Sequence, residues 1–108
     1  MCSLVSLSDV ASQYGKTSLH SASHYGRIEN VKLLIAAGAD LNLKDKYGWS
    51  PLYTASFQGE TEIVKLLIDA GASLNLKEKS GKTALDIARS NGNTGCVRLL
   101  EAAGAKPY

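Results

Sequence analysis

The sequence has 108 residues, with 12 Lys or Arg against 10 Asp or Glu and a net charge of +2. A chain of this length forms one domain, and its balanced charge provides no bulk attraction for a nucleic acid or a membrane surface. The longest mostly apolar stretch, residues 33–39, falls far short of the roughly 20 residues that a membrane-spanning helix needs.

The first segment, residues 1–11, lacks the basic start and the sustained apolar run of a signal or transit peptide. Its Cys2 and the later Cys96 are too few to build a disulfide framework. We therefore expect an intracellular protein, in the cytoplasm or the nucleus. Since no glycine in this segment takes the register of Gly38, we interpret residues 1–11 as a degenerate or truncated lead-in.

From residue 12 onward the chain repeats with a period of 33 residues. Five series of identical residues share this register: Gly15, Gly48 and Gly81; Gly26, Gly59 and Gly92; Gly38, Gly71 and Gly104; Leu19, Leu52 and Leu85; Leu34, Leu67 and Leu100. Because the five series agree, we predict three structural units within a single domain of residues 1–108. The units span residues 12–44, 45–77 and 78–108.

Each unit has the same internal order, which the middle one illustrates. Residues 45–48 have the composition of a turn. Ser50 and Pro51 then suit the N-cap and first position of a short helix, which Gly59 ends. A second helix with one apolar stripe follows and ends at Gly71. Because neither short helix can bury its apolar side alone, we predict an all-α solenoid of stacked helix pairs, with turns projecting from one edge.

Two short motifs recur in these units. Residues 17–20, 50–53 and 83–86 read TSLH, SPLY and TALD, similar to the Thr-Pro-Leu-His signature of ankyrin repeats. Residues 38–42 and 71–75 resemble that family's loop between repeats. The resemblance covers about residues 12–106. It implies three stacked helix-turn-helix units with projecting β-turn fingers, and a role as a protein–protein interaction module, adaptor or regulator.

Some positions depart from the pattern of that family. Tyr53 and Asp86 replace the signature histidine that His20 keeps, so the hydrogen bond between repeats expected of His20 does not carry over directly. Gly95 falls inside the third outer helix, where it should cost about 1 kcal/mol of helix stability. The third unit resembles the family's C-terminal repeats.

The sequence contains no catalytic or cofactor-binding motif, neither a nucleophile elbow nor a phosphate-binding loop. His20 and His24 are spaced as half of a zinc site, but no other residue is spaced to complete it. We interpret His20 as the structural histidine of the resembled signature, His24 as a surface residue and Cys96 as a small buried side chain. We expect no enzyme, no cofactor and no metal.

Positions that change between units while carrying large or polar side chains are candidates for recognition. In the resembled family these positions, at the turns and at the ends of the inner helices, face the concave side. The candidate contact residues in the turns are Gln13, Tyr14, Lys16, Lys46, Tyr47, Trp49, Lys79 and Lys82. Those at the helix ends are His24, Tyr25, Phe57, Gln58, Ser90 and Asn91.

Five of the seven aromatic side chains fall in this candidate set, around Trp49. Clustered aromatic residues are typical of interface hot spots. The four lysines of the turns form a basic rim, which favours a partner protein with acidic groups at its margin. The same patch also favours weak self-association.

Other interpretations remain open. The lysines and aromatic residues suit nucleic-acid contacts, although the low net charge and the lack of arginine in the patch argue against them. An excised or engineered stack without a partner of its own is another possibility, which the divergence between the units disfavours. Asn42 and Asn75 resemble the loop asparagine that is hydroxylated in some ankyrin proteins.

Overall fold

The structure, a computed structural model, describes residues 18–105, and every regular element in that range is a helix. The candidate residues Gln13, Tyr14 and Lys16 and the expected lead-in of residues 1–11 lie outside this range. The elements in chain order are α1 (Ser18–His24), α2 (Ile28–Ala36), α3 (Pro51–Gln58), α4 (Thr61–Asp69), α5 (Ala84–Ser90) and α6 (Thr94–Ala102).

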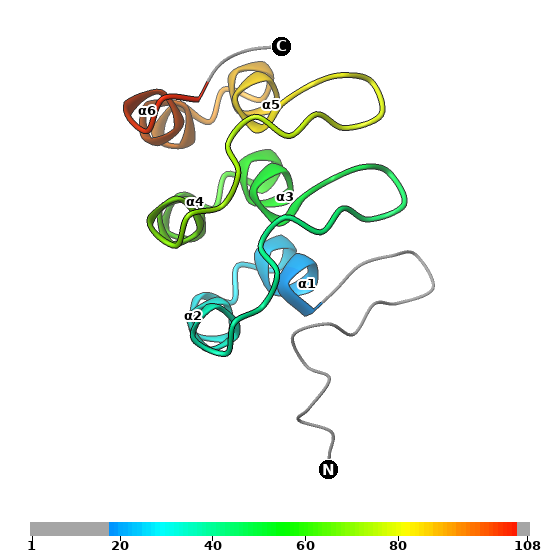
Figure 1. The fold of residues 1–108 in the computed structure, drawn as a ribbon. Coiled ribbons are helices and arrows are strands. Elements are labelled where there is room, and N and C mark those ends of the chain that lie inside the picture. Colours follow the sequence, from blue (N-terminus) through cyan, green and yellow to red (C-terminus); the bar gives the residue numbers. More distant parts are fainter. Residues whose placement is uncertain (1–17, 106–108) are drawn as a thin grey trace.

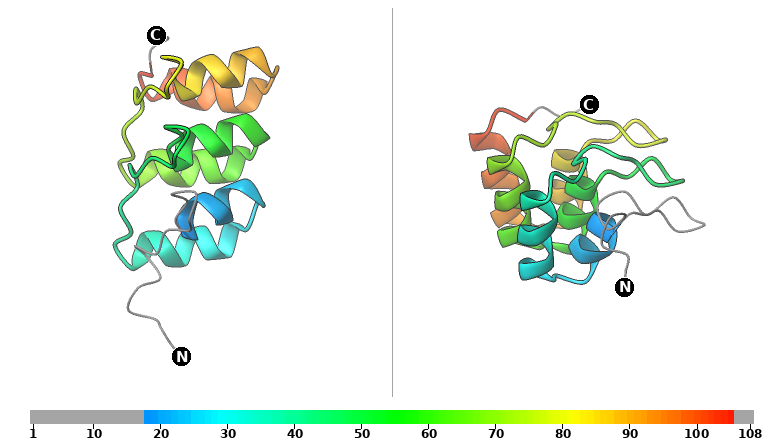
Figure 2. Two further views of the ribbon diagram at one scale, coloured as in Figure 1. Left: turned by 90° about the vertical axis from the view of Figure 1, so that its right-hand side faces the viewer. Right: turned by 60° about the horizontal axis from the view of Figure 1, so that its bottom comes forward.

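The helices form antiparallel pairs that stack in one direction (Figure 1). α1, α3 and α5 make an inner column, and α2, α4 and α6 make an outer one. Both views in Figure 2 show the pairs as successive layers, with the long loops leaving from the same edge. Each pair therefore contacts only the pair before it and the pair after it, as expected of a solenoid.

The start of α3 follows from its local sequence. Ser50 is the N-cap, and its hydroxyl accepts a hydrogen bond from the backbone N–H of Tyr53 at 3.2 Å. Pro51 occupies the first helical position, where an N–H has no helical partner. Gly59 ends the helix with a φ of 74°, a left-handed conformation that favours glycine. The expected cap, first residue and stop are therefore all confirmed.

α5 begins in a different way, which explains one departure from the repeat. Thr83 and Asp86 form a capping box, in which each side chain accepts a hydrogen bond from the other residue's backbone N–H, at 3.3 and 3.0 Å. Asp86 stands where the first unit has His20, so the third unit uses this position to secure its own helix.

The core runs between the two columns and consists of the repeated aliphatic residues. Leu19, Leu52 and Leu85 are fully buried in the inner column, and Leu67 and Leu100 in the outer one. Cys96 is fully buried beside them, as expected. Burial of these side chains is the main force that joins neighbouring units.

Polar contacts also join successive units. The Nε2 of His20 donates to the backbone carbonyl of Trp49 at 2.8 Å, which is the hydrogen bond expected of the signature histidine. The side-chain oxygen of Asn42 accepts from the N–H of Ser73 at 2.8 Å, and Asn93 donates to the carbonyl of Ser56 at 2.7 Å. Each contact ties one unit to a neighbouring unit.

Gly95 has a packing reason that its helix propensity does not show. A Cβ at this position would lie 3.1 Å from the hydroxyl of Thr61, on the preceding outer helix. The absence of a side chain therefore lets α6 approach α4 closely at this point. The expected loss of helix propensity is accompanied by a closer contact between the two helices.

Candidate binding surface

The two fingers that the structure describes are each organised by one carboxylate. In the first, Oδ1 of Asp45 accepts from the N–H groups of Tyr47 and Trp49 at 2.8 and 3.0 Å. In the second, the carboxylate of Glu78 accepts from the N–H groups of Ser80 and Lys82. A backbone hydrogen bond from residue 45 to residue 49, and from 78 to 82, closes each finger. The turn sequence thus sets the backbone conformation of each finger, and with it the positions from which the finger side chains project.

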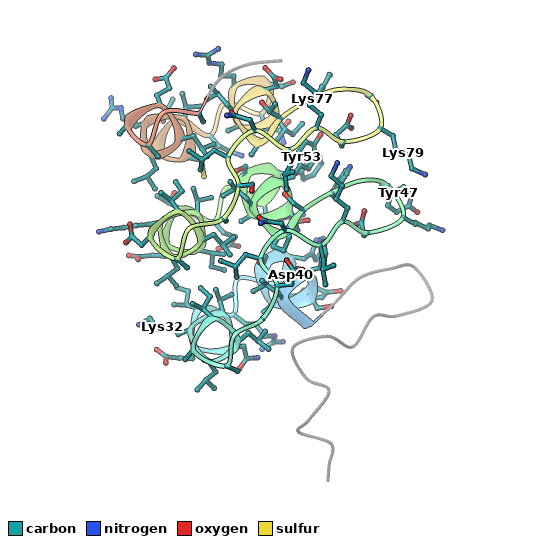
Figure 3. The ribbon with its side chains drawn as sticks, viewed as in Figure 1. Lys32, Asp40, Tyr47, Tyr53, Lys77 and Lys79 are labelled. Atoms are coloured by element: carbon teal, nitrogen blue, oxygen red, sulfur yellow. The ribbon has the colours of Figure 1, made fainter. Side chains whose placement is uncertain are left out.

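The finger of the middle unit places Trp49 against α3. Its ring centroid lies 4.9 Å from that of Tyr53 and 5.1 Å from that of Phe57, and Tyr47 follows at 6.3 Å. Tyr53 and Phe57 are four residues apart, so they share one face of the helix. We call Tyr47, Trp49, Tyr53 and Phe57 the aromatic cluster. Figure 3 shows Tyr47 on the finger and Tyr53 at the base of the next finger.

Tyr53 was not among the candidate contact residues, and it is buried. Its spacing of four residues from Phe57 is the sequence signal that could have placed it in the cluster. Trp49 is half-buried, because α3 covers one side of its ring. Tyr47 and Phe57 are the more accessible members, with exposed fractions of 51% and 37%.

A hollow of about 330 Å³ opens beside the aromatic cluster. It lies between the first and second units, since α1 contributes one wall and the finger and α3 contribute the others. Its lining residues are His24, Asp45, Tyr47, Trp49, Thr54, Phe57 and Gln58. Five of these seven are candidate contact residues from the sequence. Asp45 and Thr54 were not among those candidates.

The remaining described candidates lie around this hollow or on the next unit. Tyr25 is exposed, with its ring edge-on to that of His24 at 4.6 Å. The ammonium of Lys46 lies 5.1 Å from the ring centroid of Tyr47. Lys79 and Lys82 are exposed on the second described finger, and Figure 3 shows Lys79 projecting on the same side as Tyr47.

The end of α5 contributes less to this surface than the middle unit does. Ser90 and Asn91 are exposed, and the amide of Asn91 donates to the carbonyl of Phe57 at 3.1 Å. Asn91 therefore helps to secure the end of α3. The amide of Gln58 lies 3.3 Å from Nδ1 of His24 and bridges the hollow in a similar way.

Tyr53 also links the middle unit to the third. Its burial, together with the charge of Glu78 and a hydrogen bond to that carboxylate, raises the pKa of Tyr53 from 10.0 to about 12. The phenol hydroxyl therefore donates to a side chain of the next finger, whereas His20 donates to a backbone carbonyl of the next finger. Tyr53, at the position of the signature histidine, thus also contacts the next unit, but through a side-chain acceptor instead of a backbone carbonyl.

Two features of the described residues bear on chemistry, namely the arrangement of potential metal ligands and the thiol of Cys96. Between residues 18 and 105, no three His, Cys, Asp or Glu side chains come close enough together to hold a metal ion. Burial raises the pKa of the Cys96 thiol, which disfavours the reactive thiolate. The same range contains no helix with the length and apolar character needed to span a membrane.

Comparison with known proteins agrees with this architecture. A family model for ankyrin repeats, in three copies, matches residues 19–108. A crystal structure of an ankyrin repeat domain from Acinetobacter baumannii superposes with a TM-score of 0.87 at 39% sequence identity, covering 92% of the present chain. That alignment covers 53% of the bacterial chain, so the present chain spans about half its length. No curated protein matches the sequence. The expected all-helical solenoid of three repeats is confirmed.

Proposed function

Because this chain belongs to the ankyrin-repeat family, whose repeats are generally protein–protein interaction modules, we propose that it binds a partner protein on its fingers and inner helices. The aromatic cluster is the observation that carries this proposal. The buried core is otherwise aliphatic, yet Tyr47 and Phe57 remain accessible beside a hollow. Accessible aromatic side chains next to a concave surface are what interface hot spots use.

The charges around the cluster support a partner with acidic groups at its margin. Lys46, Lys79 and Lys82 are exposed on the fingers. Charges at the edge of an interface mainly accelerate association and select the partner, and contribute less to affinity. The proposed role is binding without catalysis, in line with a family of interaction scaffolds.

The proposal is tested with variants of exposed residues, because these leave the stack intact. Tyr47→Ala removes an accessible member of the cluster. Leu33→Ala is the matched control, since Leu33 is equally apolar, is 67% exposed and lies on the outer helix α2. Partners captured by the wild-type protein are identified by comparative mass spectrometry, and their affinities are then measured with purified components.

We expect Tyr47→Ala to lower the affinity by roughly 30-fold or more, corresponding to about 2 kcal/mol at a hot spot. Leu33→Ala should leave the affinity unchanged. A partner lost with Leu33→Ala and retained with Tyr47→Ala would place the interface on the outer helices. A loss of about 10³-fold in affinity between low and moderate salt would indicate phosphate contacts, and with them a nucleic acid.

A further inference from the structure

We propose that the hollow beside the aromatic cluster binds an arginine side chain of the partner. This inference rests on the proposed function and adds the chemistry of the anchoring residue. Its basis is the combination of one buried carboxylate oxygen without a partner and several aromatic rings in the lining of the same hollow.

The carboxylate belongs to Asp45, which is 6% exposed. Its Oδ1 is occupied by two N–H groups of the finger. Its Oδ2 is buried and accepts no hydrogen bond from any described residue. A buried acceptor without a donor destabilises the protein, and more so when the acceptor is charged. Asp45 also lines the hollow, so a ligand there that donates a hydrogen bond to this carboxylate would offset that cost.

The rings supply the second half of the site. Trp49 and Phe57 are inclined to each other by 33° at a centroid distance of 5.1 Å, and both line the hollow together with Tyr47. The faces of aromatic rings carry partial negative charge and attract cations. The protein's own Lys46 ammonium lies over the ring of Tyr47, so this ring already contacts one cation.

Arginine fits both halves better than other side chains do. Its planar guanidinium stacks on an aromatic face while its N–H groups donate in the plane, and it loses hydration more readily than an ammonium. An aliphatic or phenylalanine anchor would leave Oδ2 without a donor, and a tyrosine or tryptophan anchor would donate without bringing a positive charge. A quaternary ammonium would satisfy the rings but also has no N–H to donate.

The rim adds a further requirement to the partner's sequence. Lys46 is exposed on the finger that lines the hollow, and Lys79 is exposed on the next finger, on the same side as Tyr47 (Figure 3). A basic rim around a site for a cation favours an arginine with acidic neighbours, which meet the lysines while the guanidinium meets Asp45. The expected recognition element is therefore an acidic segment with a central arginine.

The test uses Trp49, which is the only tryptophan in the chain and lines the hollow. The probe is the blocked tripeptide Glu-Arg-Glu, titrated at constant ionic strength while the tryptophan emission is recorded. Comparison peptides carry citrulline, a neutral isostere of arginine, or norleucine at the centre. We expect saturable binding of the arginine peptide, and affinities at least about tenfold lower for the other two.

Two variants assign the effect to residues. Asp45→Asn keeps an oxygen for the N–H groups of the finger but removes the charge, and should weaken the arginine peptide by about tenfold or more. Asp69→Asn makes the same change of charge at an exposed position on α4 and should leave binding unchanged. If Asp45→Asn does not fold, Phe57→Leu tests the site instead, because it removes a ring and keeps apolar volume.

The inference is wrong if the arginine peptide does not saturate, or if the citrulline or norleucine peptide binds within about threefold of it. It is also wrong if Asp69→Asn weakens binding as much as Asp45→Asn does. Each of these results would leave the proposed function unaffected, provided that Tyr47→Ala still abolishes capture of the partner protein. Loss of the proposed function, in contrast, requires partner binding that is insensitive to Tyr47→Ala.

Discussion

At the position where His20 bonds to the following finger, the second unit has Tyr53, and its hydroxyl takes a different partner in the finger that follows. A phenol reaches farther than an imidazole, so it meets the Glu78 carboxylate instead of a backbone carbonyl. The carboxylate itself already organises the finger through its backbone N–H groups. One substitution in the signature is thus accommodated by one acidic residue in the next turn.

Tyr53→Phe should lower the free energy of unfolding by about 1.5–3 kcal/mol, the value of a hydrogen bond to a charged group. The effect should depend on pH in a defined direction. Because the pKa of Tyr53 in the folded protein, about 12, exceeds the ordinary 10.0, its stabilisation is complete below pH 10 and is lost as the pH rises toward 12.

Urea unfolding of the wild type and of Tyr53→Phe at increasing pH measures this contribution. The difference in unfolding free energy between the two proteins should shrink above pH 10. A difference that stays constant through this range would mean that the hydroxyl makes no proton-dependent contact with Glu78.

At the scale of single elements, the inner and outer helices begin differently. α3 and α5 have side-chain caps from Ser50 and Thr83, whereas α2, α4 and α6 have no side-chain cap. Each outer helix follows the inner helix of its pair after a tight turn. α3 and α5 follow long fingers, so they need a local signal that defines where they start.

Ser50→Ala should therefore destabilise the protein by about 1 kcal/mol, because the N–H of Tyr53 loses its acceptor. Ser73→Ala is the matched control, since Ser73 is exposed and contributes only its backbone N–H to Asn42. The midpoint of chemical denaturation measures both. Equal shifts for the two variants would argue against a capping role for Ser50.

The glycines that follow α3 and α4 provide a second comparison. Gly59 and Gly71 both have positive φ, of 74° and 91°, so alanine at either site should cost about 1 kcal/mol in backbone strain. A Cβ on Gly59 would also lie 3.1 Å from the side-chain oxygen of Asn93, whereas Gly71 faces open space. Gly59→Ala should therefore be the more destabilising in thermal unfolding, and the reverse order would contradict the arrangement around Asn93.

At the scale of the whole molecule, stability depends on contacts between neighbouring units. α4 packs against α2 on one side and α6 on the other, whereas α6 has a neighbouring outer helix described on one side only. A fully buried residue in α4 therefore supports both junctions of the stack. Since the coupling between units passes through the middle one, the middle unit controls cooperative unfolding.

Leu67→Ala should cost roughly 2–5 kcal/mol by opening a cavity in α4. Leu100→Ala, the equivalent change in α6, should cost less, because only one described outer helix packs against α6. Circular dichroism reports all helices and the fluorescence of Trp49 reports the middle unit. Both signals should coincide in the wild type, and unchanged stability in Leu67→Ala would contradict the register of the repeat.

The sequence by itself determined the repeat, the helix starts and the core. The 33-residue register placed Leu52, Leu67 and their counterparts at equivalent buried positions, and Ser50, Pro51 and Gly59 defined α3. These features are local or repeated, so a short stretch of chain or a comparison of units contains the whole signal. The same comparison singled out the candidate contact residues of the middle unit, as positions that change between units, and their role in binding stays a prediction.

Only the tertiary structure decided how the units meet. The stacking of Trp49 on Tyr53 and Phe57, the contact from Tyr53 to Glu78 and the fit of Gly95 against Thr61 each depend on how a finger or a neighbouring helix lies against another element. The burial of Asp45 beside the hollow depends on the same spacing. A repeat pattern specifies that neighbours stack, but the distance and angle between them follow from packing of the whole core, and those two quantities decide which side chains meet.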